Sequence, residues 1–228
     1  MNILAVETST EYCSVALWQD GAVSERCELV GQKHSEVLLA MLDALLKDAG
    51  ITMQQVDGIA FGKGPGSFTG VRIACGVTQG LALGANLNVV GVCTLQALAE
   101  ASGKDQVIAA LDARMGELYL AAYEKRRGAW QTVIAPCLCK AADAPVVEGD
   151  GWCGAGNGFA VQGTALQARY DGHLQVGCVE SGVFPRAAAI AVLGAAEFIK
   201  GKAVDAALAL PLYLRDKVAL KTSERVAK

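Results

Sequence analysis

The stretch that decides the fold is residues 3–30, ILAVETSTEYCSVALWQDGAVSERCELV, in which apolar runs alternate with short polar turns. Residues 3–8, 12–18 and 22–30 have the composition of β-strands. Asp20-Gly21 is a strong hairpin signal between the second run and the third. These residues predict an antiparallel meander at the start of the chain.

Helices and strands alternate after the meander. Ser35 is the expected N-cap of the first helix, Gly50 ends it, and Thr69 is the expected N-cap of the second. The expected elements are a helix over 36–49, a strand over 56–62, a helix over 69–85, a strand over 88–92 and a helix over 94–101.

The strand-rich pattern then restarts near residue 104. Strands are expected over 106–112, 117–123 and 130–135, and a helix over 186–200. The glycine cluster 149–158 indicates a loop or a tight crossing. Two strand-rich starts predict an α/β chain of two related halves, residues 1–104 and 105–228, with the C-terminal segment packing back on the first half.

Composition restricts the class of protein. The 228 residues are 53% hydrophobic and 19% charged, with a net charge of −3, which is typical of a globular chain and not of a disordered one. Apolar stretches such as 187–196 and 206–214 are shorter than the ~18 residues that span a bilayer. Residues 1–10 have no basic, signal-like start. We therefore expect a cytoplasmic protein without a membrane segment.

Eight cysteines suggest at first a disulfide framework, but the chain is too large to need one, and several cysteines lie among apolar residues. We expect reduced, buried thiols. Cys137 and Cys139, with Cys153, could suggest a metal site, but the second ligand pair of a zinc site is missing. The alternative is that Cys137 and Cys139 are two residues on the same side of a strand.

The two long N-terminal helices have an unusual surface. The leucine-rich helix spreads its apolar side chains over an arc of roughly 200°, whereas a surface helix needs about 100°. The second helix carries glycines at four-residue spacing, which either let it press on its own sheet or leave a smooth groove for another helix. We predict a partner-binding interface made of His34, Val37, Leu38, Met41, Leu42, Leu45, Ile73, Gly76, Val77, Gly80 and Gly84.

Two loops could bind phosphate. The loop 62–70 places glycines before a helix, and Thr8, Ser9 and Thr10 form a hydroxyl-rich turn after the first strand. The P-loop and Rossmann patterns both fail in the loop 62–70. Thr8, Ser9, Thr10, Gly64 and Gly66 are the candidate nucleotide-binding residues, and ordinary turn residues are the alternative.

Residues typical of catalysis are few. His34 and His173 are the two histidines, so neither H-E-x-x-H nor another paired-histidine motif can be written. The chain has no G-x-S-x-G sequence either. The sequence therefore predicts neither a metal site nor a catalytic residue.

Several motifs together resemble one family. They are Ala5-Val6-Glu7-Thr8-Ser9-Thr10, His34-Ser35-Glu36 with the leucine helix, Gly64-Pro65-Gly66-Ser67-Phe68-Thr69-Gly70-Val71-Arg72, Asp112-Ala113-Arg114-Met115-Gly116-Glu117-Leu118-Tyr119, and Pro211-Leu212-Tyr213-Leu214-Arg215. In this order they resemble the TsaB (YeaZ) family, the non-catalytic subunit of the bacterial machinery that makes threonylcarbamoyladenosine in tRNA.

The resemblance implies an actin-like (ASKHA) fold of two α/β halves. It also implies a catalytic TsaD-type paralogue docked through the two helices, a TsaE-type ATPase, and tRNA contact mainly through the partner. Alone, the chain would form a homodimer and bind no cofactor, with ATP or ADP at the partner boundary. Alternative functions are a small-molecule kinase or ATPase of the actin-like fold and a metallopeptidase.

Overall fold

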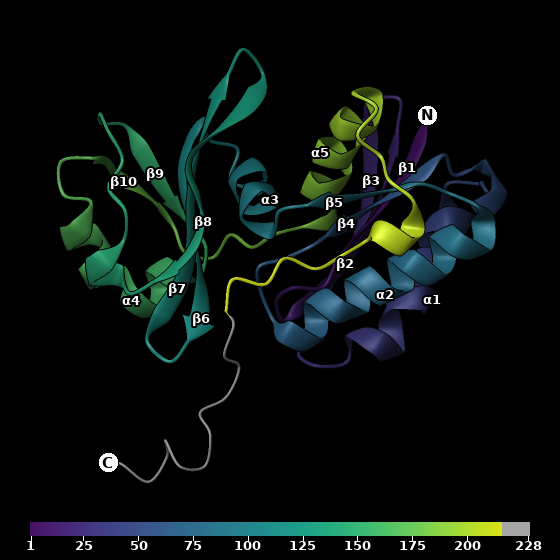
Figure 1. Cartoon of the computed structure of the whole chain (residues 1–228), viewed down its shortest axis with the longest axis horizontal. Helices are drawn as coiled ribbons and strands as arrows, with labels where there is room; N and C mark the ends of the chain where they lie inside the picture. The colour runs from purple at the N-terminus through teal and green to yellow at the C-terminus, as the bar shows by residue number, and fades with distance from the viewer. Residues whose placement is uncertain (216–228) are drawn as a thin grey trace, which may run out of the picture.

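Two five-stranded mixed sheets form the framework of the molecule, one in each half of the chain (Figure 1). This computed structural model describes residues 1–215. The strand order is β3-β2-β1-β4-β5 in the first sheet and β8-β7-β6-β9-β10 in the second. In both sheets an antiparallel meander continues into two parallel strands. The predicted α/β fold of two related halves is confirmed.

The first sheet begins with the predicted meander. Asp20 and Gly21 turn the hairpin with φ angles of 47° and 102°, the left-handed conformations that this kind of turn requires. The elements of the first half are β1 (Asn2–Glu7), β2 (Tyr12–Gln19), β3 (Ala22–Leu29), α1 (His34–Asp48), β4 (Gly58–Gly62), α2 (Phe68–Ala85), β5 (Val89–Val92) and α3 (Thr94–Ala101).

The second sheet contains elements that the sequence did not predict. A strand runs through the middle of the glycine cluster 149–158, so the alternative of a loop is wrong there, and a helix and a further strand follow it. The alternative of a tight crossing agrees with the structure, since a Cβ at Gly156 would overlap the Ala110 carbonyl oxygen. The elements of the second half are β6 (Gln106–Arg114), β7 (Glu117–Arg126), β8 (Ala129–Cys139), β9 (Trp152–Ala155), α4 (Gly158–Arg169), β10 (Leu174–Glu180) and α5 (Ala187–Ile199).

The starts of the two long helices differ from expectation. Helix α1 begins at His34, and its N-cap position is Lys33 with no side-chain cap, so Ser35 is not the cap. In α2 the Ser67 hydroxyl accepts a hydrogen bond from the Gly70 N–H at 3.3 Å, so Ser67 and not Thr69 is the N-cap. Both helices therefore start slightly earlier than the composition suggested.

The first sheet is covered on both faces. Helices α1 and α2 pack on one face, where Leu38 and Met41 meet Leu4 and Val15 of the strands. Helix α5, which comes from the second half of the sequence, covers the other face. A Cβ at Gly194 would overlap that of Ala60, so this glycine allows α5 to lie directly on β4. The division near residue 104 separates the sheets, and the chain returns to the first sheet at α5.

The second sheet has its own two cores. Helix α4 supplies Phe159 and Leu166 to one face. On the other face, Leu95 and Leu98 of α3 pack against the strands. Helix α3 therefore lies between the two halves, as Figure 1 shows.

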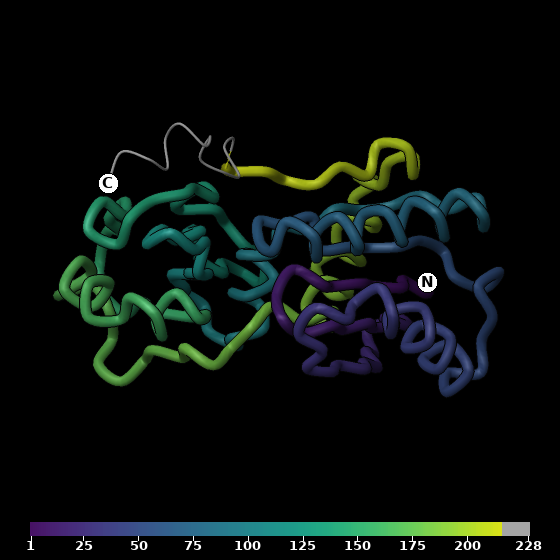
Figure 2. Tube along the Cα trace, turned by 90° about the horizontal axis from the view of Figure 1, so that it is seen from below, coloured from purple at the N-terminus to yellow at the C-terminus, as the bar shows by residue number. Residues whose placement is uncertain are grey.

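The last described segment connects the halves again. We call residues 209–215 the C-terminal strap, and Figure 2 shows it running alongside α2 toward the second half. The Ala209 carbonyl accepts hydrogen bonds from Cys75 Sγ and Gln79 Nε2, both at 3.0 Å. At the other end, Arg215 pairs with Glu117 at 2.6 Å. The strap is thus anchored on both halves.

The cysteines differ from the expectation of reduced thiols. Cys153 of β9 and Cys178 of β10 form a disulfide, because the two strands are neighbours and bring the Cα atoms within 4.9 Å. The sequence does not reveal this pairing because the glycine-rich stretch around Cys153 carries no strand pattern. Cys137 and Cys139 are free and lie on one side of β8, opposite Leu120 and Leu118. Among residues 1–215, no helix has the length and apolar character needed to cross a membrane.

Candidate functional site: an exposed glycine face beside the junction of the halves

One side of α2 consists of glycine and is open to solvent. Gly76, Gly80 and Gly84 are exposed, and a Cβ placed on any of them would meet no atom within 4 Å. We call these three residues the glycine face. The glycines therefore do not serve to press α2 onto its own sheet, which was the alternative interpretation of the sequence.

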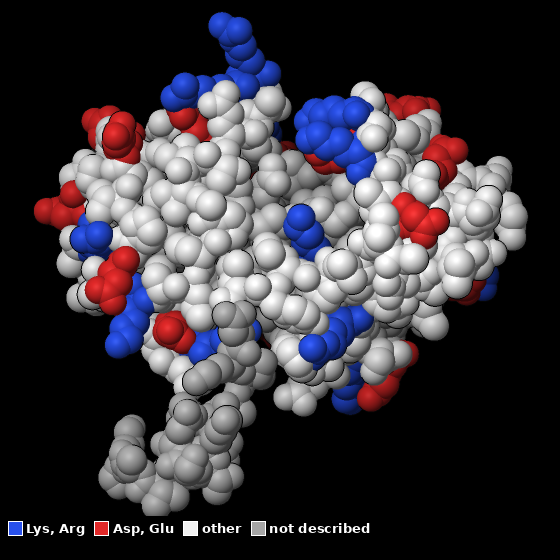
Figure 3. All heavy atoms as spheres, viewed as in Figure 1, with Lys and Arg blue, Asp and Glu red and all other residues white. Residues whose placement is uncertain are grey.

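The border of the glycine face is apolar. Ile73 and Val77 of α2 and Val37 of α1 are half-buried, and Leu83 is 79% exposed. In Figure 3 much of the surface in the region of α2 carries no charge. The backbone of α2 is thus accessible in a shallow, mostly uncharged surface, which is a geometry that a second helix can approach closely.

Five of the predicted interface residues belong to the core instead. The sheet-facing side of α1 is at most 5% exposed, and it contains His34, Leu38, Met41, Leu42 and Leu45. These side chains fill the space between α1 and the first sheet, so they are not available to a partner. The prediction rests on the part of the apolar arc that one sheet cannot cover, but these five side chains lie on the part that the sheet does cover.

An aromatic cluster at the start of α2 was not among the predicted site residues. The Arg72 guanidinium lies over the Phe68 ring at 3.2 Å and faces the Tyr213 ring at 5.1 Å. Phe68 and Tyr213 are each 44% exposed. All three belong to motifs that the sequence displays, but only the fold brings the strap to α2. The cluster extends the exposed side of α2 toward the strap.

A cavity of about 540 Å³ lies where the two halves and the strap meet. The first half contributes the turn after β1 and the start of α2, the second half contributes the β6–β7 hairpin, and the strap closes one side. Lining residues include Ser9, Thr10, Glu11, Gly66, Ser67, Phe68, Asp112, Arg114, Met115, Asn157, Tyr213 and Arg215.

The candidate nucleotide-binding residues divide into two groups. Ser9, Thr10 and Gly66 line the cavity. Thr8 is buried and its hydroxyl donates to the Gly70 carbonyl at 2.7 Å, and Gly64 is buried beneath the strap. Two of the five residues are thus engaged within the chain and do not face the cavity.

The β6–β7 hairpin holds an unusual backbone at the cavity. Arg114 and Met115 have φ angles of 64° and 57°, a conformation that side chains other than glycine adopt at a cost. Asp112 fixes this turn because its carboxylate accepts a hydrogen bond from the Arg114 N–H at 2.8 Å. The strap adds Arg215, whose guanidinium donates to the Ala113 carbonyl at 3.1 Å.

Glu7 lies behind the cavity at the end of β1 and is buried. Burial raises the pKa of its carboxyl to about 7, against the opposing effect of the Ser9 N–H, which donates to Oε1 at 2.5 Å. A side chain at Gly62 would overlap the carboxyl. Glu7 therefore supports the hydroxyl-rich turn from inside and is not part of the cavity surface.

The two histidines lie in different halves of the chain and make separate contacts. His34 Nε2 donates to backbone carbonyls of Thr10 and Tyr12, at 2.8 and 3.2 Å. His173 Nδ1 lies 2.7 Å from the Gly149 carbonyl in the second half. Within the described part of the chain, no three His, Cys, Asp or Glu side chains come together as possible metal ligands.

Two halves of the same strand order, joined around a cavity, define an α/β protein of the actin-like class. Residues 26–221 match the family model described as TsaD, tRNA N6-adenosine threonylcarbamoyltransferase. A solved structure titled YeaZ from Pseudomonas aeruginosa is similar with a TM-score of 0.82 and 36% identity, covering 93% of this chain and 99% of that one. A second Pseudomonas aeruginosa structure, an uncharacterized protein with similarity to peptidase YEAZ, has a TM-score of 0.86 at 36% identity, covering 94% and 99%.

Curated relatives agree with the structural neighbours. The Escherichia coli K12 protein named tRNA threonylcarbamoyladenosine biosynthesis protein TsaB is 38% identical, over 97% of both chains. A Haemophilus influenzae protein of the same name is 34% identical, over 97% of this chain and 96% of that one. The chain belongs to the TsaB (YeaZ) family, which confirms the resemblance in its motifs.

Proposed function

We propose that this chain acts in tRNA threonylcarbamoyladenosine biosynthesis as a non-catalytic subunit that binds a TsaD-type catalytic paralogue. A TsaE-type ATPase completes the complex, and tRNA is contacted mainly through the partner, in the cytoplasm. The names of near full-length relatives support the pathway. A net charge of −3 agrees with a limited direct role in tRNA binding.

The observation that carries this proposal is the exposed glycine face of α2. Each glycine inside a helix costs up to about 1 kcal/mol relative to alanine. The chain's own packing does not require the three glycines, since a Cβ at each would meet nothing within 4 Å. A close approach by a helix from another molecule gives these positions a use, because a side chain there would hold that helix away.

The glycine face and the neighbouring cavity support two further parts of the proposal. In the free protein the glycine face can pair with the same face of a second copy by a two-fold axis, which gives a homodimer. The cavity opens beside the start of α2, since Ser67 and Phe68 line it. We therefore place ATP or ADP at the boundary with the partner, and no cofactor in the chain alone.

A reconstituted modification assay tests the function. The chain, a TsaD-type partner, a TsaE-type ATPase and unmodified tRNA are combined, and threonylcarbamoyladenosine is measured by nucleoside mass spectrometry. We expect product from the complete mixture, none without this chain, and a loss of about tenfold or more with Gly80→Leu. Gly163→Leu is the matched control, because Gly163 is also a helical glycine whose Cβ would meet nothing within 4 Å.

Two results would contradict the proposal. Full tRNA modification with the Gly80→Leu variant would show that the glycine face is not the partner interface. Threonylcarbamoyl transfer by this chain without the TsaD-type partner would show that the chain is itself catalytic.

A further inference from the structure

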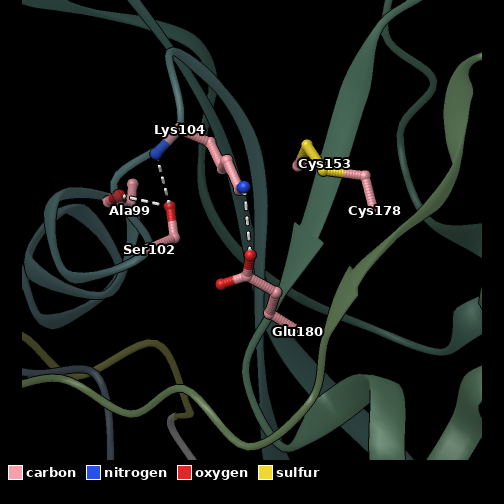
Figure 4. Close-up of a disulfide and its surroundings, with 6 residues drawn as sticks. All are labelled: Ala99, Ser102, Lys104, Cys153, Cys178 and Glu180. Carbon is pink, nitrogen blue, oxygen red and sulfur yellow. Dashed lines mark hydrogen bonds and ion pairs between the residues drawn. A yellow bond between two sulfur atoms is a disulfide. The ribbon is translucent and has the colours of Figure 1, made fainter.

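The disulfide lies at the edge of the second sheet, on the last strand. Cys153 belongs to β9, and Cys178 belongs to β10, which is the edge strand of that sheet. Figure 4 shows the disulfide near the ion pair between Lys104 and Glu180, whose charged atoms are 3.3 Å apart. Lys104 lies in the link from α3 to β6, where the chain passes from the first half to the second. The ion pair therefore connects the end of β10 to this link.

The pairing of β10 with β9 is interrupted at the disulfide. Leu174 pairs with Trp152 and Val179 pairs with Gly154, so the longer stretch of β10 between these pairs bulges outward. Within the bulge, Val176 is 99% exposed and Gly177 has a φ angle of 74°. The disulfide therefore connects a segment that the strand register does not hold.

The two cysteine residues differ in exposure. Cys153 is 4% exposed and lies within the sheet, whereas Cys178 is partly exposed at the end of the bulge. A thiolate from solution is expected to attack the sulfur of the more exposed residue, Cys178, and Cys153 then becomes the leaving group. The geometry thus gives the two cysteines different chemical roles.

We infer that Cys153–Cys178 is a thiol–disulfide exchange site whose co-reactant is a dithiol reductant. A thiolate of the reductant attacks Cys178 Sγ, the sulfur–sulfur bond breaks, and Cys153 leaves as a thiolate that takes up a proton. The second thiol of the reductant then attacks the first reductant sulfur, which is bonded to Cys178 in the mixed disulfide, and Cys178 is released as a thiolate that takes up a proton. Two electrons pass to this protein, and the reductant becomes a disulfide.

Reduction releases the bulge without affecting the other strands of the sheet. Residues 174–180 lose the covalent connection to β9, while the antiparallel pairs of β6 with β7 stay in place. The effect extends to Glu180, which is two residues beyond Cys178. This inference rests on contacts within the second half and is independent of the proposed partner binding.

Peptide mapping and hydrogen exchange test the site in the native full-length chain. We expect Cys153 and Cys178 to resist alkylation until a dithiol, dithiothreitol, is added without denaturant, while partly exposed Cys27 is alkylated in both states. Reduction is expected to speed amide exchange in residues 174–180 about tenfold, with little change in β6 and β7. The double variant Cys153→Ser/Cys178→Ser should exchange like the reduced protein with or without dithiothreitol.

Single variants test which sulfur is attacked. Cys178 in Cys153→Ser should react with a thiol reagent about tenfold faster than Cys153 in Cys178→Ser. The opposite order would overturn attack at Cys178. Alkylation of both cysteines before reduction, resistance to dithiothreitol until the chain unfolds, or unchanged exchange in residues 174–180 would each overturn the exchange site.

Discussion

At the scale of single residues, Glu7 belongs to a motif whose sequence does not show where each of its side chains lies in the fold. The turn Glu7-Thr8-Ser9-Thr10 is visible in the sequence as a hydroxyl-rich loop, and Ser9 and Thr10 do line the cavity. Burial of Glu7 and the hydrogen bond from Thr8 to Gly70 depend on residues about sixty positions away. Such contacts leave no local signal in the sequence.

The raised pKa of Glu7, about 7, predicts a pH dependence of stability. Between about pH 5 and pH 7 the unfolded chain loses this proton while the folded chain keeps it, so stability falls as pH rises. Glu7→Gln removes the ionisation, and its free energy of unfolding relative to wild type should increase over this range by up to about 3 kcal/mol. Urea unfolding at a series of pH values measures this, and a constant difference would contradict it.

At the scale of elements, the sequence predicts the strands and helices from β1 to β8 and also helix α5, but it does not predict β9, α4 or β10. The apolar periodicity of α1 and α2 is strong, so their positions were correct within two residues. Strand β9 and helix α4 begin within a run rich in glycine, which usually indicates a loop. There, close packing needs the glycines: a Cβ at Gly154 would overlap Phe159 at 2.6 Å.

The C-terminal strap predicts a measurable connection between the halves. Arg215 and Glu117 are 2.6 Å apart, with side chains 16% and 29% exposed. Arg215→Ala removes this ion pair and the hydrogen bond to Ala113, and we expect it to lower the free energy of unfolding by about 1 kcal/mol. Urea unfolding with Glu117→Gln and the double variant gives the coupling energy, and fully additive effects would show that the pair does not connect the halves.

At the scale of the whole molecule, the cavity forms because the chain builds two halves and then returns to the first half through α5 and the C-terminal strap. The sequence indicated the two strand-rich starts and the division near residue 104. It did not show that α5 lies directly on the first sheet, because an alanine-rich helix fits many surfaces. The cavity also depends on three segments that are distant in sequence, so no single motif predicts it.

The close fit of α5 predicts a large effect at Gly194. A Cβ there would overlap the Cβ of Ala60 in β4, so α5 and β4 would have to move apart to accept a side chain. We expect Gly194→Val to lower the free energy of unfolding by about 3 kcal/mol. Gly163→Ala on α4 is the control and should change it by less than about 1 kcal/mol, since a Cβ there meets nothing within 4 Å. Equal stability of both variants would contradict the close contact of α5 with the sheet.

Isothermal titration of the chain with a purified TsaD-type protein measures whether the glycine face of α2 binds the proposed partner. We predict that Gly80→Leu raises the dissociation constant about a hundredfold or abolishes binding, while Gly163→Leu binds like wild type. Circular dichroism and thermal unfolding establish that both variants are folded. Wild-type affinity of a folded Gly80→Leu variant would show that the partner does not bind at the glycine face.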